Sequence, residues 1–263
     1  MSHDSGAEVL KLEQVSKSFK MGNIFGGREH LAVNDVSLSV GRNQVLGLVG
    51  ESGSGKSTLG RIAIGLISPT TGSVKVEGKE ITDLNPRELR RQRRNMQMIF
   101  QDSSNSLNPR MTLLDLLVEP MRVQGLHTKA DRIKRARKLA DEVALPQASL
   151  GRLPHEFSGG QRQRISIARA LALEPSLIVA DEPVSALDVS VQATVLNLMK
   201  DIQENRELSM LFISHDMAVV EFMADEVAVL NRGSIVETGP TEEIFSNPQN
   251  AYTQKLLEAA PSL

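Results

Sequence analysis

Short apolar runs alternate along this chain with segments of helical periodicity. Residues 9–15 and 32–40 alternate apolar with polar side chains, which is typical of strands with one buried face. Residues 44–49 form a compact apolar run that enters a glycine-rich turn, and residues 55–67 then have helical spacing that stops near Pro69. Because strand patterns are followed by helical ones, we expect an α/β fold built on a sheet.

The middle of the chain has a different pattern from its two flanks. Residues from about 111 to 156 are rich in helical spacing, and 129–143 is the clearest amphipathic segment. The pattern predicts one domain over residues 8–240, with a helical subdomain at about 102–165 inserted in the α/β core. In the flanks, further helices are expected over 161–173 and 190–203, and further strands over 74–79, 96–100, 177–180 and 210–213.

The last part of the pattern predicts a hairpin and a tail. Residues 227–231 and 234–237 are strand-like and flank an Arg-Gly pair, which favours a tight hairpin turn. Residues 241–263 then read as a short helical tail, in which the helices are broken at Asn247-Pro248.

Charge and composition narrow the chemistry. The net charge of −2 gives no reason to expect nucleic acid as a partner. The chain has no cysteine, which excludes disulfides, thiolate zinc sites and cysteine-ligated iron–sulfur clusters. Residues 1–6 are polar, so no signal peptide is expected, and apolar runs such as 45–50 are too short to cross a bilayer. If the protein serves a membrane, it docks on other subunits.

The turn after residues 44–49 has the spacing of a phosphate-binding loop, G-x-x-x-x-G-K-[ST], between a strand and a helix. Glycines let the backbone aim several N–H groups at one anion, and the following helix adds the positive end of its dipole. Lys56 is expected to reach the β- and γ-phosphates, and the Ser57 hydroxyl to coordinate magnesium. The predicted binding segment is Gly50, Glu51, Ser52, Gly53, Ser54, Gly55, Lys56, Ser57 and Thr58.

Two carboxylates follow the apolar run at 177–180. A buried parallel strand delivers its carboxyl end to the ligand crevice, so Asp181 and Glu182 are expected beside the phosphates. Asp181 would hold magnesium, and Glu182 would polarise the water that attacks the γ-phosphate. The alternative is that Asp181 and Glu182 only cap a turn and have no catalytic role.

A second glycine-containing motif names a family. The segment Phe157, Ser158, Gly159, Gly160 and Gln161 resembles the signature motif of ABC ATPases and opens a predicted helix. The resemblance implies a P-loop NTPase fold of the ABC nucleotide-binding type, with a RecA-like core, an antiparallel β subdomain and an inserted helical subdomain. It also implies that this segment contacts the γ-phosphate bound by the opposite subunit of a dimer.

Four further residues match the family's motifs in the family's order. Gln101 follows a strand pattern and resembles the Q-loop glutamine, which senses magnesium and the attacking water. Asp188 ends a segment that resembles the D-loop, and His215 matches the switch histidine that contacts the γ-phosphate and steadies Glu182. Phe19 resembles the aromatic residue that stacks on adenine, with a place in the core as its alternative. The resemblance implies ATP and Mg²⁺ as ligands.

The details of the motifs are similar to one branch, the ATPases of oligopeptide, dipeptide and nickel importers, and most similar to its F-type subunit. The segments that carry this likeness are 101–110, 154–157, 180–188 and 247–254. Many relatives have a longer, cysteine-containing tail. Because this sequence stops at Leu263 and has no cysteine, we do not expect the family's iron–sulfur or regulatory tail here.

This likeness implies a set of partners and a place in the cell. We expect a second ABC ATPase subunit, with a heterodimer favoured and a homodimer possible. Two membrane permease subunits and, indirectly, an extracytoplasmic substrate-binding protein complete the expected assembly. The expected location is peripheral, on the cytoplasmic face of the inner membrane, and the expected cargo is a peptide, with nickel or a metal chelate next.

Several alternatives stay open at this point. An ABC ATPase that acts on ribosomes or DNA ends, an exporter's ATPase and a purely regulatory nucleotide-binding module share parts of these motifs. The arginine-rich segment 87–94 favours a solvated helix face over a nucleic-acid patch. Residues 107–120 are expected, from the family, to help form the groove that receives a permease helix.

Overall fold

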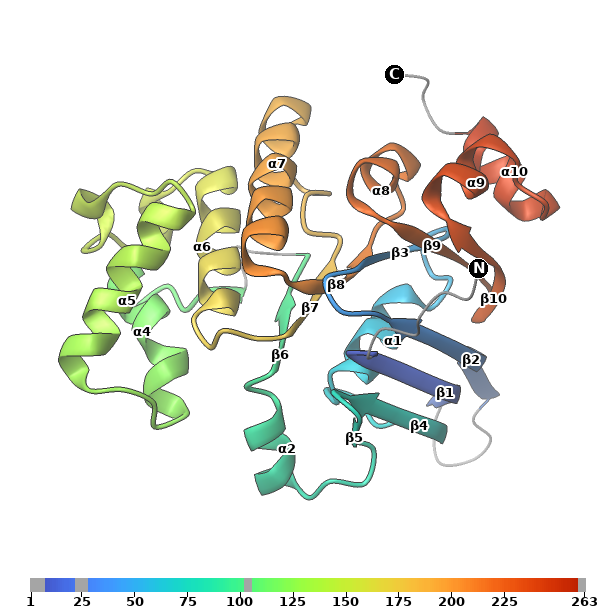
Figure 1. The fold of residues 1–263 in the computed structure, drawn as a ribbon, viewed down its shortest axis with the longest axis horizontal. Helices are drawn as coiled ribbons and strands as arrows, with labels where there is room; N and C mark the ends of the chain where they lie inside the picture. Colours follow the sequence, from blue (N-terminus) through green and yellow to red (C-terminus); the bar gives the residue numbers. More distant parts are fainter. Residues whose placement is uncertain (1–7, 22–27, 102–105, 260–263) are drawn as a thin grey trace.

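The structure is a computed structural model that describes residues 8–21, 28–101 and 106–259 (Figure 1). A six-stranded sheet is parallel except at one edge, where its last strand turns back on its neighbour. Across the sheet, the order is β10 (Ser234–Pro240), β9 (Glu226–Asn231), β3 (Val45–Val49), β8 (Ser209–Ile213), β7 (Leu177–Asp181) and β6 (Met96–Ile99). Every residue of β3, β7 and β8 is buried, which explains their continuous apolar runs.

A second, antiparallel sheet contains the first strands of the chain. Its order is β2 (Arg28–Val40), β1 (Leu10–Met21), β4 (Thr71–Val76) and β5 (Lys79–Glu80). The two predicted strands are confirmed, but β1 and β2 are both longer than their patterns indicated. Irregular register between Leu12 and Ser18 shifts the side chains from one face to the other, so the strict alternation ends before the strand does.

One helix, α1 (Lys56–Ala63), lies between the two sheets (Figure 1). Its Leu59 and Ile62 are buried in a core shared with both sheets. The helix ends earlier than predicted because Gly65 takes a left-handed conformation, φ +63°, and the N–H of Leu66 returns to the carbonyl of Arg61 at 2.8 Å. A hydrogen bond of this kind, next to a left-handed glycine, is typical of a Schellman cap, which ends a helix.

Helices cover the face of the six-stranded sheet that is turned away from α1, and they extend past the β6 edge of that sheet (Figure 1). The predicted helix-rich middle is confirmed as α4 (Leu113–Val123) and α5 (Lys129–Glu142), followed by the short segments η1 (Gln147–Ser149) and η2 (Pro154–Glu156). The remaining helices of this layer are α6 (Gly159–Leu171), α7 (Val189–Arg206) and α8 (Met217–Met223). The pattern did not predict α8, because seven residues are too few to show helical periodicity.

Two small features of the fold agree with the sequence pattern. A short helix, α2 (Pro86–Gln92), carries the start of the arginine-rich segment and has its side chains mostly exposed, as expected. The hairpin turn between β9 and β10 is confirmed: Arg232 and Gly233 both have positive φ, as a type I′ turn requires.

The tail folds back beside β9 and β10, at the end of the molecule opposite α4 and α5 (Figure 1). It contains α9 (Thr241–Ser246) and α10 (Ala251–Glu258), and the predicted break at Asn247-Pro248 separates them. Among the helices of the described residues, none is both long and apolar enough to span a membrane.

Candidate functional site

The phosphate loop connects the buried strand β3 to the start of α1, as its sequence predicts. Gly50 has φ +152°, and a Cβ atom there would lie 2.1 Å from the carbonyl oxygen of Leu230. Gly55 has φ +109°, and its Cβ would lie 2.3 Å from the carbonyl oxygen of Ala32. Neighbouring backbone therefore touches the loop at both ends, and no other residue type fits at these positions.

Lys56 points back into the loop that precedes it. Its Nζ donates to the carbonyls of Gly50, at 2.6 Å, and of Glu51, at 3.0 Å, and the residue is 4 % exposed. Burial lowers the pKa of Lys56, while the nearby carboxylates of Glu182 and Asp181 oppose that shift. The loop thus presents a desolvated ammonium, held by its own backbone, which is the donor that a phosphate needs.

Ser57 and Asp181 lie next to each other although they come from different elements. The Ser57 hydroxyl donates to Asp181 Oδ1 at 2.8 Å, at the junction of α1 and the end of β7. Burial raises the pKa of Asp181, and the bond from Ser57 opposes this rise. A hydroxyl and a carboxylate oxygen are ligands that Mg²⁺ accepts, so the residues present fit this ion.

Glu182 is held between Gln101 and His215. Gln101 Nε2 donates to Glu182 Oε2 at 3.1 Å, and His215 Nδ1 lies 3.2 Å from Glu182 Oε1. The three residues follow the strands β6, β7 and β8, whose carboxyl ends meet at one edge of the sheet. The predicted trio is therefore brought together by topology.

The backbone of Glu182 is also unusual. Its φ of +47° is left-handed, which costs a residue other than glycine free energy, and its N–H donates to the carbonyl of Ile213 at 2.9 Å. The Ser185 hydroxyl donates a hydrogen bond to the Glu182 carbonyl at 3.1 Å. The strand thus ends in a turn that aims the Glu182 carboxylate toward Gln101 and His215.

A cavity of about 420 Å³ opens over the loop and this carboxylate. Its lining includes most of the predicted loop residues, namely Ser52, Gly53, Gly55, Lys56, Ser57 and Thr58, together with Gln101 and Glu182. Phe19 of β1 forms part of the wall, is 36 % exposed, and has Lys17 Nζ 5.3 Å from its ring centroid.

Two lining residues were missed by the sequence analysis, His30 and Ala32 of β2. Both precede the loop by about twenty positions and carry no motif. Only the packing of the antiparallel sheet against the phosphate loop brings them to the cavity, so no signal in the sequence pointed to them.

The signature segment lies at the start of α6 and does not line this cavity. Ser158 caps the helix, accepting from the N–H of Gln161 at 3.3 Å, while Gln161 Oε1 accepts from the N–H of Ser158 at 3.0 Å. Phe157 is 4 % exposed and belongs to the core. A Cβ on Gly160 would lie 2.4 Å from Val191 Cγ1, so this glycine has a packing role as well.

Other predicted residues also lie apart from the cavity. Asp188 is exposed at the start of α7, and Glu51 and Ser54 belong to the loop without lining the cavity. Ser54 is nevertheless buried, and its Oγ has no hydrogen-bond partner among the described residues. Residues 102–105 of the predicted Q-loop lie outside the described part of the chain.

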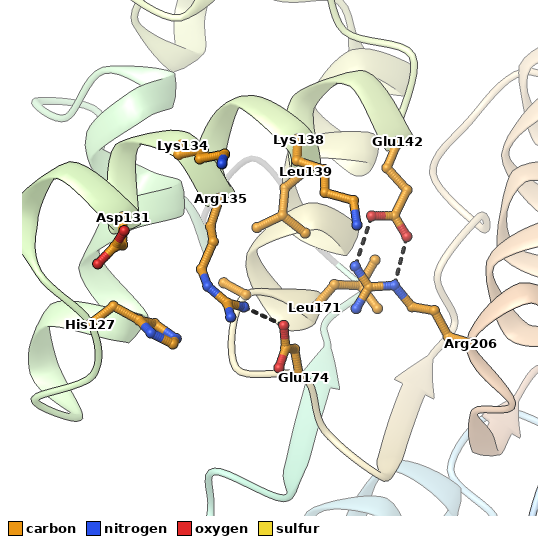
Figure 2. A pocket seen from close by; sticks show the side chains of 11 residues that line it. His127, Asp131, Lys134, Arg135, Lys138, Leu139, Glu142, Leu171, Glu174 and Arg206 are labelled. Atoms are coloured by element: carbon orange, nitrogen blue, oxygen red, sulfur yellow. Dashed lines mark hydrogen bonds and ion pairs between the residues drawn. The ribbon is translucent and has the colours of Figure 1, made fainter.

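A second hollow of similar volume, about 430 Å³, lies between α5 and the ends of α6 and α7 (Figure 2). Its charges pair across the wall: Arg206 binds both oxygens of Glu142, at 2.6 and 2.7 Å, and Arg135 binds Glu174. These pairs join α5 to the core of the protein. None of the predicted site residues is in this lining.

Comparison with known proteins identifies relatives over most of the chain. The family model described as "ABC transporter" matches residues 33–185, and the one described as "Oligopeptide/dipeptide transporter, C-terminal region" matches residues 236–263. The putative peptide import ATP-binding protein of Brucella ovis is 55 % identical over 230 residues, which cover 88 % of this chain and 73 % of that protein. The oligopeptide transport ATP-binding protein AppF of Bacillus subtilis is 47 % identical, covering 96 % of this chain and 78 % of its own.

Solved structures with the same fold include a dimeric ATP-binding cassette in a post-hydrolysis state, bound to ADP and Pi. It is 31 % identical to this chain, with a TM-score of 0.79, and the match covers 88 % of this chain and 98 % of that one. A cassette of a Clostridium perfringens transporter complex also has a TM-score of 0.79, at 24 % identity and with 92 % of each chain covered. The predicted fold class is confirmed.

Proposed function

Because the chain belongs to the family of ABC transporter ATP-binding proteins, we propose that it is the ATP-hydrolysing subunit of a peptide importer and works as one half of an ATP-driven clamp. Each ATP lies between the phosphate loop of one subunit and the signature segment, residues 157–161, of the other. Closure completes both sites and moves the permease toward its other conformation. ATP drives this change only as far as it binds the closed state better than the open one.

The environment of Glu182 is the observation that best supports ATP hydrolysis by this chain. One carboxylate oxygen is bound by Gln101 and the other faces His215, so the carboxylate is oriented from two sides. In this position Glu182 accepts a proton from the attacking water, Gln101 orients that water, and His215 steadies the carboxylate. Phe19 stacks on the adenine ring.

Ser57, Asp181 and Gln101 would hold magnesium, which would neutralise charge on the phosphate oxygens when bound. The bond between Ser57 and Asp181 supports this assignment, because it brings two oxygen ligands to the foot of the phosphate loop. Lys56 binds the β- and γ-phosphates, and the N–H groups of residues 52–58 surround them. The exposed Asp188 acts across the dimer, where the opposite subunit approaches the start of α7.

The permease docks in a hollow of about 340 Å³ beside the Q-loop. Exposed apolar side chains of Leu66 and Val123 line it, together with Phe100, the residue that precedes Gln101. A helix seated there would press on the strand end that carries Gln101, and Gln101 contacts Glu182. The hollow includes Pro120 of the segment that the sequence suggested, whereas Leu107 is 3 % exposed and faces the core.

The expected assembly has two permease subunits and a second, related ATPase, with a heterodimer favoured by the likeness to F-type subunits. The chain then sits on the cytoplasmic face of the membrane and cooperates with an extracytoplasmic binding protein. Cargo is a peptide, as the names of the relatives suggest; nickel or a metal chelate is the second candidate.

A pull-down from native membranes tests this assembly. A tagged Glu182→Gln chain, given ATP and Mg²⁺ to hold the closed state, should retain two permease subunits and a related ATPase, identified by mass spectrometry. The same preparation without ATP is the matched control for the closed state. Recovery of ribosomal or chromosomal proteins with no permease would contradict the importer assignment and leave the ATPase assignment in place.

A further inference from the structure

The tail helix α10 contacts the phosphate loop at a single hydrogen bond. The Tyr252 hydroxyl accepts from the main-chain N–H of Glu51 at 3.0 Å, although the two residues are 201 positions apart. The same peptide unit is held at its other end, because the Gly50 carbonyl accepts from Lys56 Nζ at 2.6 Å. One peptide plane therefore joins the tyrosine of the tail to the lysine that faces the phosphates.

Tyr252 is itself held in place by the end of the sheet. The carboxylate of Glu237 on β10 accepts from the N–H groups of Gln249 and Asn250, at 2.7 and 3.2 Å. Asn250 caps α10 by accepting from the N–H of Tyr252 at 2.8 Å. The tyrosine also packs against the hydrophobic core. The hydroxyl is thus fixed by β10 and by the core rather than by the loop that it contacts.

We propose that Tyr252 is a positioning residue for nucleotide binding: by bonding the Gly50–Glu51 peptide, it fixes the carbonyl that orients the Lys56 ammonium. Tyr252 does not line the nucleotide cavity, so it acts through this peptide and not by touching ATP. The proposal rests on the proposed function only in that Lys56 binds phosphate. It adds that the tail and the nucleotide site are coupled.

Coupling of this kind is reciprocal. If docking of the tail strengthens nucleotide binding, then nucleotide binding strengthens docking of the tail by the same factor. A hydrogen bond of this type changes an equilibrium by about fivefold to tenfold. The effect is expected in the affinity for ATP and not in the chemical step, because Tyr252 bonds the backbone of the loop, whereas Glu182 is held by Gln101.

The first test is Tyr252→Phe, which keeps the ring and removes the acceptor. We expect the KM for ATP to rise about fivefold, with kcat changed less than about twofold and an unchanged melting temperature. Gln254→Ala is the matched control, because it removes a tail hydrogen bond to the Pro248 carbonyl, at 2.9 Å, that does not involve the loop. Equal KM values for the wild type and Tyr252→Phe would overturn the proposal.

A second test needs no variant of the tyrosine. The chain has one tyrosine and no tryptophan, so intrinsic emission reports on Tyr252 alone. Inorganic tripolyphosphate with Mg²⁺, which does not absorb where tyrosine is excited, should change this emission in a saturable way. Emission that stays constant while calorimetry records tripolyphosphate binding would overturn the proposal.

The two tests separate this inference from the proposed function. Lys56→Ala should weaken tripolyphosphate binding about tenfold to a hundredfold and should move the change in emission to the same higher concentrations. A wild-type chain that binds neither ATP nor tripolyphosphate would contradict the proposed function itself. Normal binding with no dependence on Tyr252 would contradict only the coupling of the tail.

Discussion

At the scale of single residues, we expect nucleotide binding to depend most on Lys56. Lys56→Ala removes a buried cation that aims at the phosphates and leaves the Gly50 and Glu51 carbonyls without their donor. A charge-assisted hydrogen bond is worth about 1.5–3 kcal/mol, so we expect the Kd for ATP to rise roughly tenfold to a hundredfold. Isothermal calorimetry measures this directly.

Lys200→Ala is the matched control for Lys56, because it removes the same charge at a site whose Nζ bonds the Phe222 carbonyl at 3.0 Å. It should leave the affinity for ATP unchanged. An equal loss of affinity in both variants would mean that net charge, and not the position of Lys56, determines binding.

Glu237 provides a prediction about pH. Burial alone would raise its pKa, but hydrogen bonds from the tail, including those of the Gln249 and Asn250 N–H groups, outweigh burial and hold the pKa below its ordinary value. A depressed folded-state pKa adds stability that is present above the unfolded value, about 4.3, and is lost as the pH falls through the folded value. Wild type should therefore be more stable than Glu237→Gln at pH 7, and the difference should shrink in acid.

Urea unfolding of both chains between pH 7 and pH 3 measures this difference. Glu258→Gln, an exposed acid on the same tail, is the control and should track the wild type at every pH. A gap between wild type and Glu237→Gln that is constant with pH would contradict the role given to the carboxylate.

At the scale of elements, α6 approaches α7 closely at Gly160. Gly160→Ala adds a Cβ 2.4 Å from Val191 Cγ1, a stiff β-branched side chain, and overpacking of this kind costs about 1–3 kcal/mol. Gly159→Ala is the control, because its Cβ would meet Leu187 at an ordinary 3.4 Å. Denaturant midpoints that are equal for the two variants would show that Val191 yields without cost.

The elements also show what the sequence could and could not predict. The phosphate loop was predictable because all its groups lie in one continuous segment with a fixed spacing. The roles of Gln101 and His215 beside Glu182 were expected only from the resemblance to the family, and the structure shows why the three residues meet: parallel strands place their carboxyl ends together. His30 and Ala32 carry no local signal, and the tail motif that contains Tyr252 gave no indication of a contact with the phosphate loop. All three residues reach the loop only through the fold of the antiparallel sheet and of the tail.

At the scale of the whole molecule, the predicted binding residues lie in two separate places. The phosphate loop and Glu182 face one cavity, while Ser158 to Gln161 lie at the start of another helix and do not line it. In the proposed assembly, a second subunit supplies the missing wall. The dimeric form of a related cassette with bound ADP and Pi is consistent with this arrangement.

ATP turnover by Glu182→Gln tests most directly whether Glu182 activates the attacking water. Phosphate release at saturating ATP and Mg²⁺ is compared with that of wild type at equal protein concentration, while the Kd for ATP is measured in parallel. We predict that turnover falls about 10²-fold or more and that the Kd changes by less than about twofold, because the amide keeps the shape of the carboxylate but cannot accept the proton of the attacking water. Turnover equal to that of the wild type would contradict the role of Glu182 and, with it, the mechanism.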